Sequence, residues 1–188
     1  MSDEPSALDV AIELGEAFEA HRIDYAIGGA LAYGFWGIPR ATVDVDINLF
    51  CPEAALDQVV GVTAPLGIAL DVDSARSQAE ADGLIVVQYR GMRVDLFVPS
   101  VPFSWEALRT RVRVGLKGHD VWILSAEATA VFKLLFFRGK DVVDLQRLVA
   151  VQGAQLDDAY VRRWIVDMVG EDDARVARWD RLLTERIV

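Results

Sequence analysis

The sequence is poor in the residues that several classes of protein require. It has one cysteine, Cys51, which excludes a disulfide within the chain and suits a reducing cytoplasm. Its two histidines, His21 and His119, lie in no catalytic or metal-binding motif. No apolar run approaches the roughly 20 residues needed to cross a bilayer. The first residues, MSDEPSALDV, lack the basic and then apolar order of a secretion signal. We therefore expect a cytoplasmic protein with no membrane partner.

Apolar and acidic residues are abundant by contrast. Hydrophobic residues make up 53% of the 188, enough for a sizeable core in one domain or in one domain with a small helical addition. The net charge of −10 argues against coating nucleic acid by bulk attraction. The sign reverses at residues 90–118, with six basic side chains against two acidic ones. This stretch could contact a polyanion or form only a solvated face.

The most informative stretch is 25–50, YAIGGALAYGFWGIPRATVDVDINLF. An apolar strand breaks at Gly28 and Gly29, a short helical segment follows, and a second strand carries Asp44 and Asp46. Because side chains alternate along a strand, the two carboxylates share one face. Such a pair on a buried strand is costly unless a cation or a proton offsets it. A hard cation, Mg²⁺ or Mn²⁺, fits oxygen ligands of this kind.

Two better-known motifs are imitated here and can be rejected. The glycine spacing after the first strand resembles a Walker A loop, but Phe35 and Trp36 stand where lysine and serine or threonine are required. A calcium loop beginning at Asp44 fails because Leu49 and Ala55 replace the glycine and the glutamate that such a loop needs. The apolar alternation also favours a strand over a loop.

Two more charged side chains lie on apolar elements. Strands are expected at 84–89 and 92–98, joined by a tight hairpin turn. Asp95 shares a face of the second strand with Arg93, so it either forms a salt bridge there or completes a metal site with the aspartate pair. Lys133 lies in the middle of an apolar helix, where it could extend to water or hold a phosphate.

The rest of the chain predicts mainly helices. They are expected at 6–21, 52–66, 105–113 (as a helix or a helix-to-strand transition), 126–140 with Ser125 as its cap, 138–147 and in two C-terminal segments, with further strands at 24–27 and 120–124. Residues 70–82 are polar and are predicted to form a loop, with Asp71 and Asp73 at the surface. Arg162 and Arg163 are predicted to be solvated.

The order of strand, glycine pair, helix, D-x-D strand and later aspartate resembles the nucleotidyltransferase superfamily with the DNA polymerase β-like fold. That superfamily has GG or GS followed by Dh[DE]h, as in Gly28-Gly29 and Asp44-Val45-Asp46-Ile47. The string GGALAYGFWGIPRATVDVDINLF is similar in particular to the AbiEii/MenT-like toxin branch, which runs GG-x-A-L…G…R-x-T-x-D-h-D. The branch also has a helical lysine and an R-x-K-D…D-L stretch, echoed by Lys133, Arg138, Lys140, Asp141, Asp144 and Leu145.

The resemblance implies an α+β fold, a small mixed sheet flanked by helices with a C-terminal helical segment. Residues 1–124 would form the nucleotidyltransferase core and residues 125–188 a helical bundle packed on it. The implied enzyme moves a nucleoside monophosphate from an NTP to an acceptor hydroxyl and releases pyrophosphate. Its metal ligands would be Asp44, Asp46 and Asp95, which with Lys133 are the implied catalytic residues.

The implied nucleotide-binding residues are Gly28, Gly29, Arg40, Thr42, Arg138, Lys140, Asp141 and Asp144. The leading hypothesis is a toxin that modifies the tRNA 3′ end, with 109–117 contacting the RNA and a cognate antitoxin as a partner. Phosphorylation of Thr42 would place charge beside the carboxylates and inhibit the enzyme. The alternatives are a small-molecule (aminoglycoside-like) acceptor, slightly favoured by the acidic charge, a protein acceptor, or a catalytically silent binding module.

Overall fold

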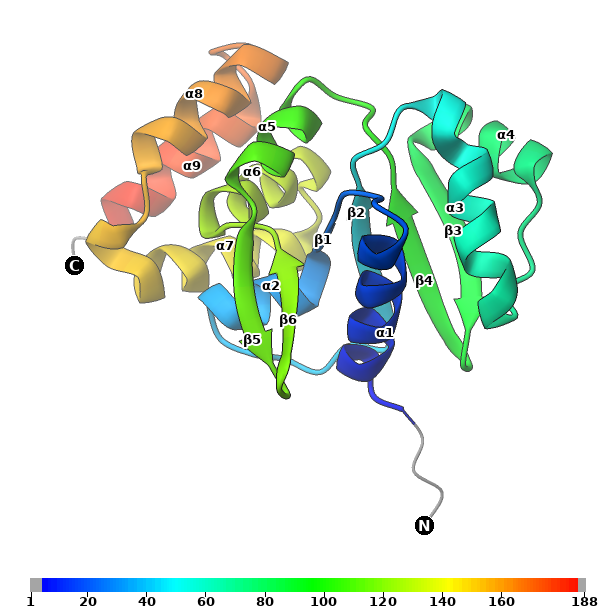
Figure 1. The fold of residues 1–188 in the computed structure, drawn as a ribbon. Coiled ribbons are helices and arrows are strands. Elements are labelled where there is room, and N and C mark those ends of the chain that lie inside the picture. Colours follow the sequence, from blue (N-terminus) through cyan, green and yellow to red (C-terminus); the bar gives the residue numbers. More distant parts are fainter. Residues whose placement is uncertain (1–4, 186–188) are drawn as a thin grey trace.

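A six-stranded mixed sheet organises residues 5–185, the part of the chain that the computed structural model describes (Figure 1). The strand order is β3-β4-β2-β1-β6-β5. The strands are β1 Tyr25–Ile27, β2 Asp44–Leu49, β3 Leu84–Tyr89, β4 Met92–Phe97, β5 Val112–Leu116 and β6 His119–Ile123. The pairs β2–β4 and β1–β6 are parallel, and the other pairs are antiparallel. The predicted α+β class with a small mixed sheet is confirmed.

One face of the sheet is covered by α1 (Ala7–Ala20), α3 (Leu56–Thr63) and α4 (Val72–Asp82), as Figure 1 shows. Val45, Ile47 and Leu49 of β2 point into this layer and are fully or almost fully buried. Their alternation with Asp44 and Asp46 therefore sends the two carboxylates to the opposite face.

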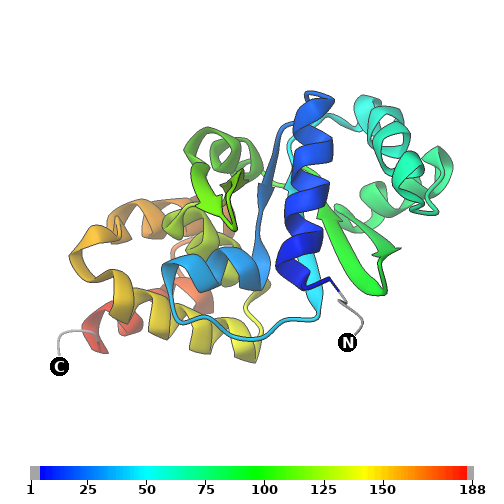
Figure 2. The ribbon, with the colours of Figure 1, turned by 60° about the horizontal axis from the view of Figure 1, so that its bottom comes forward.

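The other core lies between the sheet and a group of helices on its second side (Figure 2). The helices of this side are α2 Gly29–Trp36, α5 Phe103–Thr110, α6 Ala126–Phe136, α7 Gly139–Gln152, α8 Asp158–Val169 and α9 Ala174–Glu185. Ala26 and Tyr33 share this core with Trp179 near the C-terminus. The division into a core of 1–124 and a bundle of 125–188 stays a prediction.

Local sequence signals explain several element ends. Ser6 and Asp9 form the expected capping box of α1. Ser125 caps α6 by accepting a hydrogen bond from the amide of Ala128 at 3.0 Å. The β3–β4 hairpin turns at Arg90 and Gly91, which both have positive φ, as the tight turn predicted there requires.

The prediction of a loop at 70–82 is wrong, because most of this segment forms α4. Asp71, taken as a plain surface residue, is the N-cap and accepts a hydrogen bond from the amide of Ser74 at 2.9 Å. Ala75 is fully buried, and Gly83 ends the helix with a φ of +65°. The helix buries few side chains, so its apolar periodicity is weak in the sequence.

Two further expectations need revision. The helix predicted at 52–66 is divided into a 3₁₀ turn Glu53–Ala55, α3 and a second 3₁₀ turn Ala64–Leu66. Arg162 is not simply solvated, because it pairs with Glu171 at 2.6 Å and with Asp180 at 2.8 Å. These contacts tie α8 to α9. Within residues 5–185, no helix is both long and apolar enough to cross a membrane.

The cap of α6 should contribute measurably to stability. We expect Ser125→Ala to lower the free energy of unfolding by about 1 kcal/mol in a urea titration, because an amide of the first turn loses its partner. Ser125→Gly is the matched control and should cost only about 0.3 kcal/mol. Equal midpoints for Ser125→Ala and the wild type would show that the hydrogen bond adds nothing.

Candidate functional site

Strand register brings the three predicted carboxylates to one place. In the parallel β2–β4 pair, Asp46 lies opposite Asp95, and Asp44 lies opposite Arg93. Because alternate residues share a face, Asp44, Asp46 and Asp95 all point away from α1. All three line one cavity of about 570 Å³. The expectation that Asp95 joins its two companions on the same side of the sheet is met.

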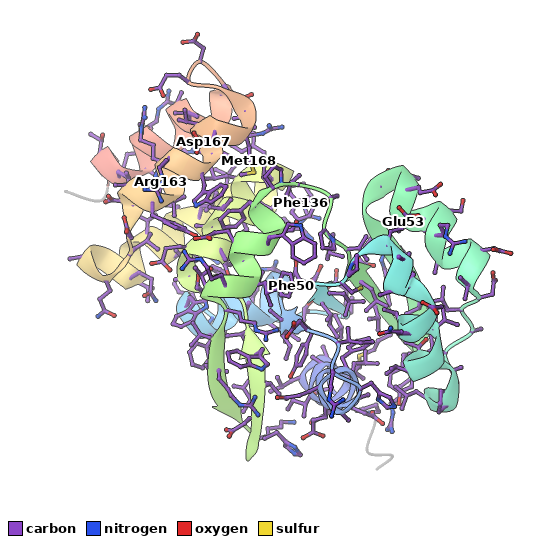
Figure 3. The ribbon with its side chains drawn as sticks, turned by 45° about the horizontal axis from the view of Figure 1, so that its top comes forward. Phe50, Glu53, Phe136, Arg163, Asp167 and Met168 are labelled. Carbon is purple, nitrogen blue, oxygen red and sulfur yellow. The ribbon has the colours of Figure 1, made fainter. Side chains whose placement is uncertain are left out.

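The cavity is bounded by the sheet on one side and by α6 and the start of α7 on another. Figure 3 shows Phe136, at the end of α6, lying toward the space beside Phe50 at the end of β2. Phe136 is about half exposed and stacks at a tilt on Phe97 of β4, with ring centroids 5.6 Å apart. The cavity thus has a charged end at the carboxylates and apolar walls elsewhere.

Asp46 occupies the most demanding electrostatic position. Burial, followed by repulsion from Asp44 and Asp95, raises the pKa of Asp46 to about 6. Its carboxylate packs directly on the backbone of Gly29, where any Cβ would collide with it. Gly29 also has a φ of +54°, so a side chain at this position would be strained as well. The amide of Gly28 donates to the backbone oxygen of Asp46 at 2.8 Å. The absence of a side chain at Gly29 therefore allows the backbone to lie directly against Asp46 of β2.

Asp44 is held in its ionised form. The hydroxyl of Thr42 donates to its carboxylate, and this hydrogen bond, with the more distant charges of Lys140 and Arg40, lowers the pKa of Asp44 despite partial burial. Thr42 therefore lies beside the carboxylates as expected, whereas its phosphorylation stays a prediction.

Asp95 is engaged by Arg93, which donates to its two carboxylate oxygens at 2.7 and 3.2 Å. The simple salt bridge weighed as an alternative is therefore present. Among residues 5–185, no group of three histidine, cysteine or acidic side chains is arranged closely enough to hold a metal ion. The donor set still suits Mg²⁺ or Mn²⁺, since it is all oxygen and Asp46 lacks a cationic partner at contact distance within the described residues.

The predicted phosphate-binding cations form a buried network with two aspartates. Lys133 is 6% exposed and does not extend to water, because its ammonium contacts Asp144 at 2.7 Å and Asp141 at 3.5 Å. Arg40 also pairs with Asp144, at 3.2 Å, and Arg138 pairs with Asp141, at 2.7 Å. Asp141 and Asp144 therefore position cations, and three positive groups share two negative ones.

The pKa of Asp141 shows which effect dominates in this network. Burial alone would raise it, but the hydrogen bonds from Arg138 and the nearby charge of Lys133 bring the pKa below its ordinary value. The carboxylate stays ionised and keeps the two cations in place. Arg40, Lys133, Arg138 and Lys140 line the same cavity as the three strand carboxylates.

The basic stretch 109–117 is neutralised within the protein. Each cation forms an ion pair of 2.6–2.7 Å, namely Arg109–Glu106, Arg111–Asp24, Arg113–Glu19 and Lys117–Asp9. Three of the four acidic partners belong to α1 or to the turn after it. The expected contact with an RNA strand would have to break these pairs, and the acidic face of α1 has a structural role.

Among the polar residues of the cavity that were not proposed as site residues from the sequence are Asn48, Thr129 and Ser104. Asn48 could have been found, because it continues the alternation of Asp44 and Asp46. Thr129 lies one helical turn before Lys133 on α6, a spacing that only becomes meaningful once Lys133 is known to face the cavity. Ser104, at the start of α5, carried no signal.

The fold is that of known nucleotidyltransferases. No protein-family model and no curated protein sequence matches the chain. The solution structure of the antibiotic-resistance factor ANT(2″)-Ia matches 97% of this chain and 99% of its own, with a TM-score of 0.60 and 12% identity. Its crystal structure in complex with adenylyl-2″-tobramycin covers 93% and 96%, with a TM-score of 0.58 and 16% identity. The lincosamide antibiotic adenylyltransferase LnuA, with lincomycin bound, covers 77% and 96%, with a TM-score of 0.50 and 15% identity.

The buried carboxylate of Asp46 should make stability depend on pH. Its pKa is about 6 in the fold against an ordinary 3.8, so the folded state binds the proton more tightly than the unfolded state. Stability from this group is therefore full below pH 4 and is lost as the pH rises to 6, by about 3 kcal/mol in all. We expect this slope in urea titrations of the metal-free protein in EDTA.

Asp46→Asn is the control for this measurement, because the amide does not titrate. The difference in unfolding free energy between wild type and Asp46→Asn should change between pH 4 and pH 6 and stay constant above pH 7. A difference that is flat across the whole range would contradict the raised pKa.

Proposed function

We propose that the protein transfers a nucleoside monophosphate from an NTP to a hydroxyl group of a small molecule. The observation that carries this proposal is the register of β2 and β4, which places three carboxylates in one cavity opposite a group of cations. Carboxylates that face cations across a cavity match the needs of a metal-bound triphosphate. The shared fold with two antibiotic adenylyltransferases supports the same chemistry.

Each side chain has a place in this reaction. A divalent cation held by Asp44 and Asp46 would neutralise the charge that develops on the phosphates. The oxygen of the acceptor hydroxyl forms a bond to the α-phosphorus, the bond from that phosphorus to the bridging oxygen breaks, and pyrophosphate leaves. Asp95 takes the proton of the hydroxyl. Arg93 donates a hydrogen bond to each oxygen of Asp95 and so weakens it as a base, but each oxygen keeps a second lone pair that can accept the proton.

The leaving pyrophosphate is matched by the cations of α6 and α7. Lys133 is fixed by Asp144 and supplies a point charge on the cavity wall, and Arg138 and Lys140 lie at the start of α7. The backbone at Gly28 and Gly29 adds the N-terminus of α2, where an anion is favoured. These groups bind and orient the phosphates, and they change little during the reaction because the ion pairs hold them in advance.

The acceptor is assigned to small molecules because of the charges outside the cavity. The cations at 109–117, which a tRNA contact would need, are bound to acidic side chains. The solved relatives carry adenylyl-2″-tobramycin and lincomycin. A small acceptor needs only the cavity, whereas a tRNA needs an extended basic surface. A toxin acting on tRNA, with an antitoxin partner, is the competing hypothesis.

The acceptor class can be read from one labelling experiment. The protein is incubated with each α-³²P NTP, Mg²⁺, total tRNA and a panel of hydroxylated antibiotics that includes aminoglycosides and lincosamides. We expect label on a small molecule and none on tRNA. Label on tRNA would reverse the assignment of the acceptor and restore the toxin hypothesis.

The carboxylate pair is tested by Asp44→Ala, which should lower NTP consumption by more than about 100-fold because the metal and its charge stabilisation are lost. Asp73→Ala is the matched control, since Asp73 belongs to a second D-x-D sequence but is exposed on α4. Both variants should keep the wild-type midpoint of thermal unfolding to within a few degrees. Full activity of Asp44→Ala would exclude the proposed reaction.

The effect of Arg93 on the carboxylates is tested by Arg93→Met. Because the positive charge of Arg93 offsets the negative charge of Asp95 beside the proposed metal site, its loss should raise the affinity for Mg²⁺ by about threefold to tenfold in a calorimetric titration. Arg90→Met is the control, since Arg90 pairs with Glu13 of α1. A weaker affinity in Arg93→Met would mean that Arg93 helps to build the metal site.

A further inference from the structure

One wall of the cavity carries a buried hydroxyl without a partner. Among residues 5–185, four buried side-chain atoms lack any hydrogen bond: Tyr33 Oη, Thr129 Oγ1, Trp164 Nε1 and Arg178 Nε. Of these four residues, Thr129 alone lines the cavity, and its side chain is 2% exposed. A buried hydroxyl normally finds a partner, because leaving it unpaired is unfavourable. Its partner is therefore to be sought in what the cavity binds.

Two more polar side chains face the same cavity. Asn48 is 8% exposed and Ser104 is 6% exposed, so both are largely removed from solvent. Asn48 follows Asp46 by two residues on the same face of β2. Three small polar side chains from β2, α5 and α6 thus line the same cavity as the carboxylates and could form hydrogen bonds with a ligand there. Hydrogen-bonding groups of this kind give a largely apolar pocket its specificity.

Asn48 and Thr129 belong to the part of the cavity where β2 lies close to the start of α6. The side chains of Asn48 and Leu124 come within 2.5 and 3.3 Å of the place that a Cβ on Gly28 would take, so they are neighbours. Leu124 directly precedes the capped first turn of α6, and Thr129 follows in that helix. Phe50 and Leu124 add apolar side chains to the lining of the cavity.

The proposed reaction divides the cavity among three groups of the substrates. The triphosphate belongs with the cations at the start of α7. The acceptor belongs beside Asp95 of β4, which takes its proton. The nucleoside would then occupy the remaining part of the cavity, which follows β2 from Asp46 to Asn48 and reaches Thr129. An apolar lining with a few hydrogen-bonding groups suits a planar heterocycle.

We propose that Thr129, together with Asn48 and Ser104, hydrogen-bonds the base of the NTP and makes the protein select one nucleotide over the others. This assignment rests on the proposed nucleotidyl transfer and adds the group that reads the nucleotide. The protein would select one nucleotide because a base whose donors and acceptors do not match leaves these buried groups without hydrogen bonds. The matching base forms hydrogen bonds with them.

The test removes the hydroxyl and keeps the shape, by Thr129→Val. Dissociation constants are measured by calorimetry with Mg²⁺ and the α,β-methylene analogues of ATP, GTP, CTP and UTP, from which no nucleotide can be transferred. We expect the wild type to prefer one analogue. Thr129→Val should bind that analogue about tenfold more weakly and the other three within about twofold of the wild type.

Thermal unfolding of the ligand-free variant separates recognition from a structural role. Since the hydroxyl has no partner in the protein, its loss should leave the unfolding midpoint unchanged or raise it. Thr63→Val is the matched control, because Thr63 is also buried but donates to the backbone oxygen of Val60 at 3.2 Å on the other side of the sheet. It should lower the midpoint and leave all four dissociation constants unchanged.

The outcomes distinguish this inference from the function on which it rests. If the wild type binds none of the four analogues, the proposed function falls and the base site falls with it. If the wild type binds them without preference, or if Thr129→Val binds each as the wild type does, the base site alone is overturned. An equal loss for all four analogues would also overturn base reading, because it would assign the hydroxyl to the sugar or the phosphates.

Discussion

The parallel pairing of β2 with β4 determines the character of this molecule. It places Asp46 opposite Asp95, with Asp44 two residues before on the same face, so three negative charges meet in a partly buried cavity. Such an arrangement is unfavourable by itself, as the raised pKa of Asp46 shows. Two neighbouring groups partly offset this repulsion. The hydroxyl of Thr42 donates a hydrogen bond to Asp44, and the guanidinium of Arg93 forms an ion pair with Asp95. The remaining negative charge is what a metal-bound substrate would neutralise.

Two separate sets of ion pairs hold most of the basic residues that the sequence suggested as binding groups. The first joins β5, β6 and neighbouring positions to α1, and it leaves the second side of the sheet untouched. The second holds Lys133, Arg40 and Arg138 on the cavity wall through Asp141 and Asp144. The number of basic residues in a stretch of sequence therefore does not predict whether that stretch binds an anionic ligand. What matters is whether the pairing leaves a cation facing a space that a substrate can enter.

Sequence reasoning succeeded where a feature is fixed by neighbours in the chain. Strand alternation placed Asp44 and Asp46 together, and the strong apolar pattern of 84–98 gave the hairpin that carries Asp95. It failed where a tertiary contact decides. The weak pattern of α4 hid a helix whose N-cap, Asp71, was nevertheless visible in the sequence.

The ion-pair partners of the predicted cations show the same limit. Asp144 contacts Lys133 and Arg40, which lie 11 and 104 residues away, while its expected part in nucleotide binding stays a prediction. Thr129 and Ser104 were missed for a related reason, because only the packing of α5 and α6 on the sheet turns them toward the cavity. No local pattern encodes distances of this kind.

The order in which the cavity wall appears along the chain has a consequence for biosynthesis. Gly29, Asp44, Asp46 and Asp95 are made early, whereas Lys133, Arg138 and Lys140 emerge from the ribosome only afterwards. A nascent chain that ends near residue 124 contains the three strand carboxylates of the cavity without these three cations. We therefore expect the cavity to be complete only after α6 and the first turn of α7 have been translated.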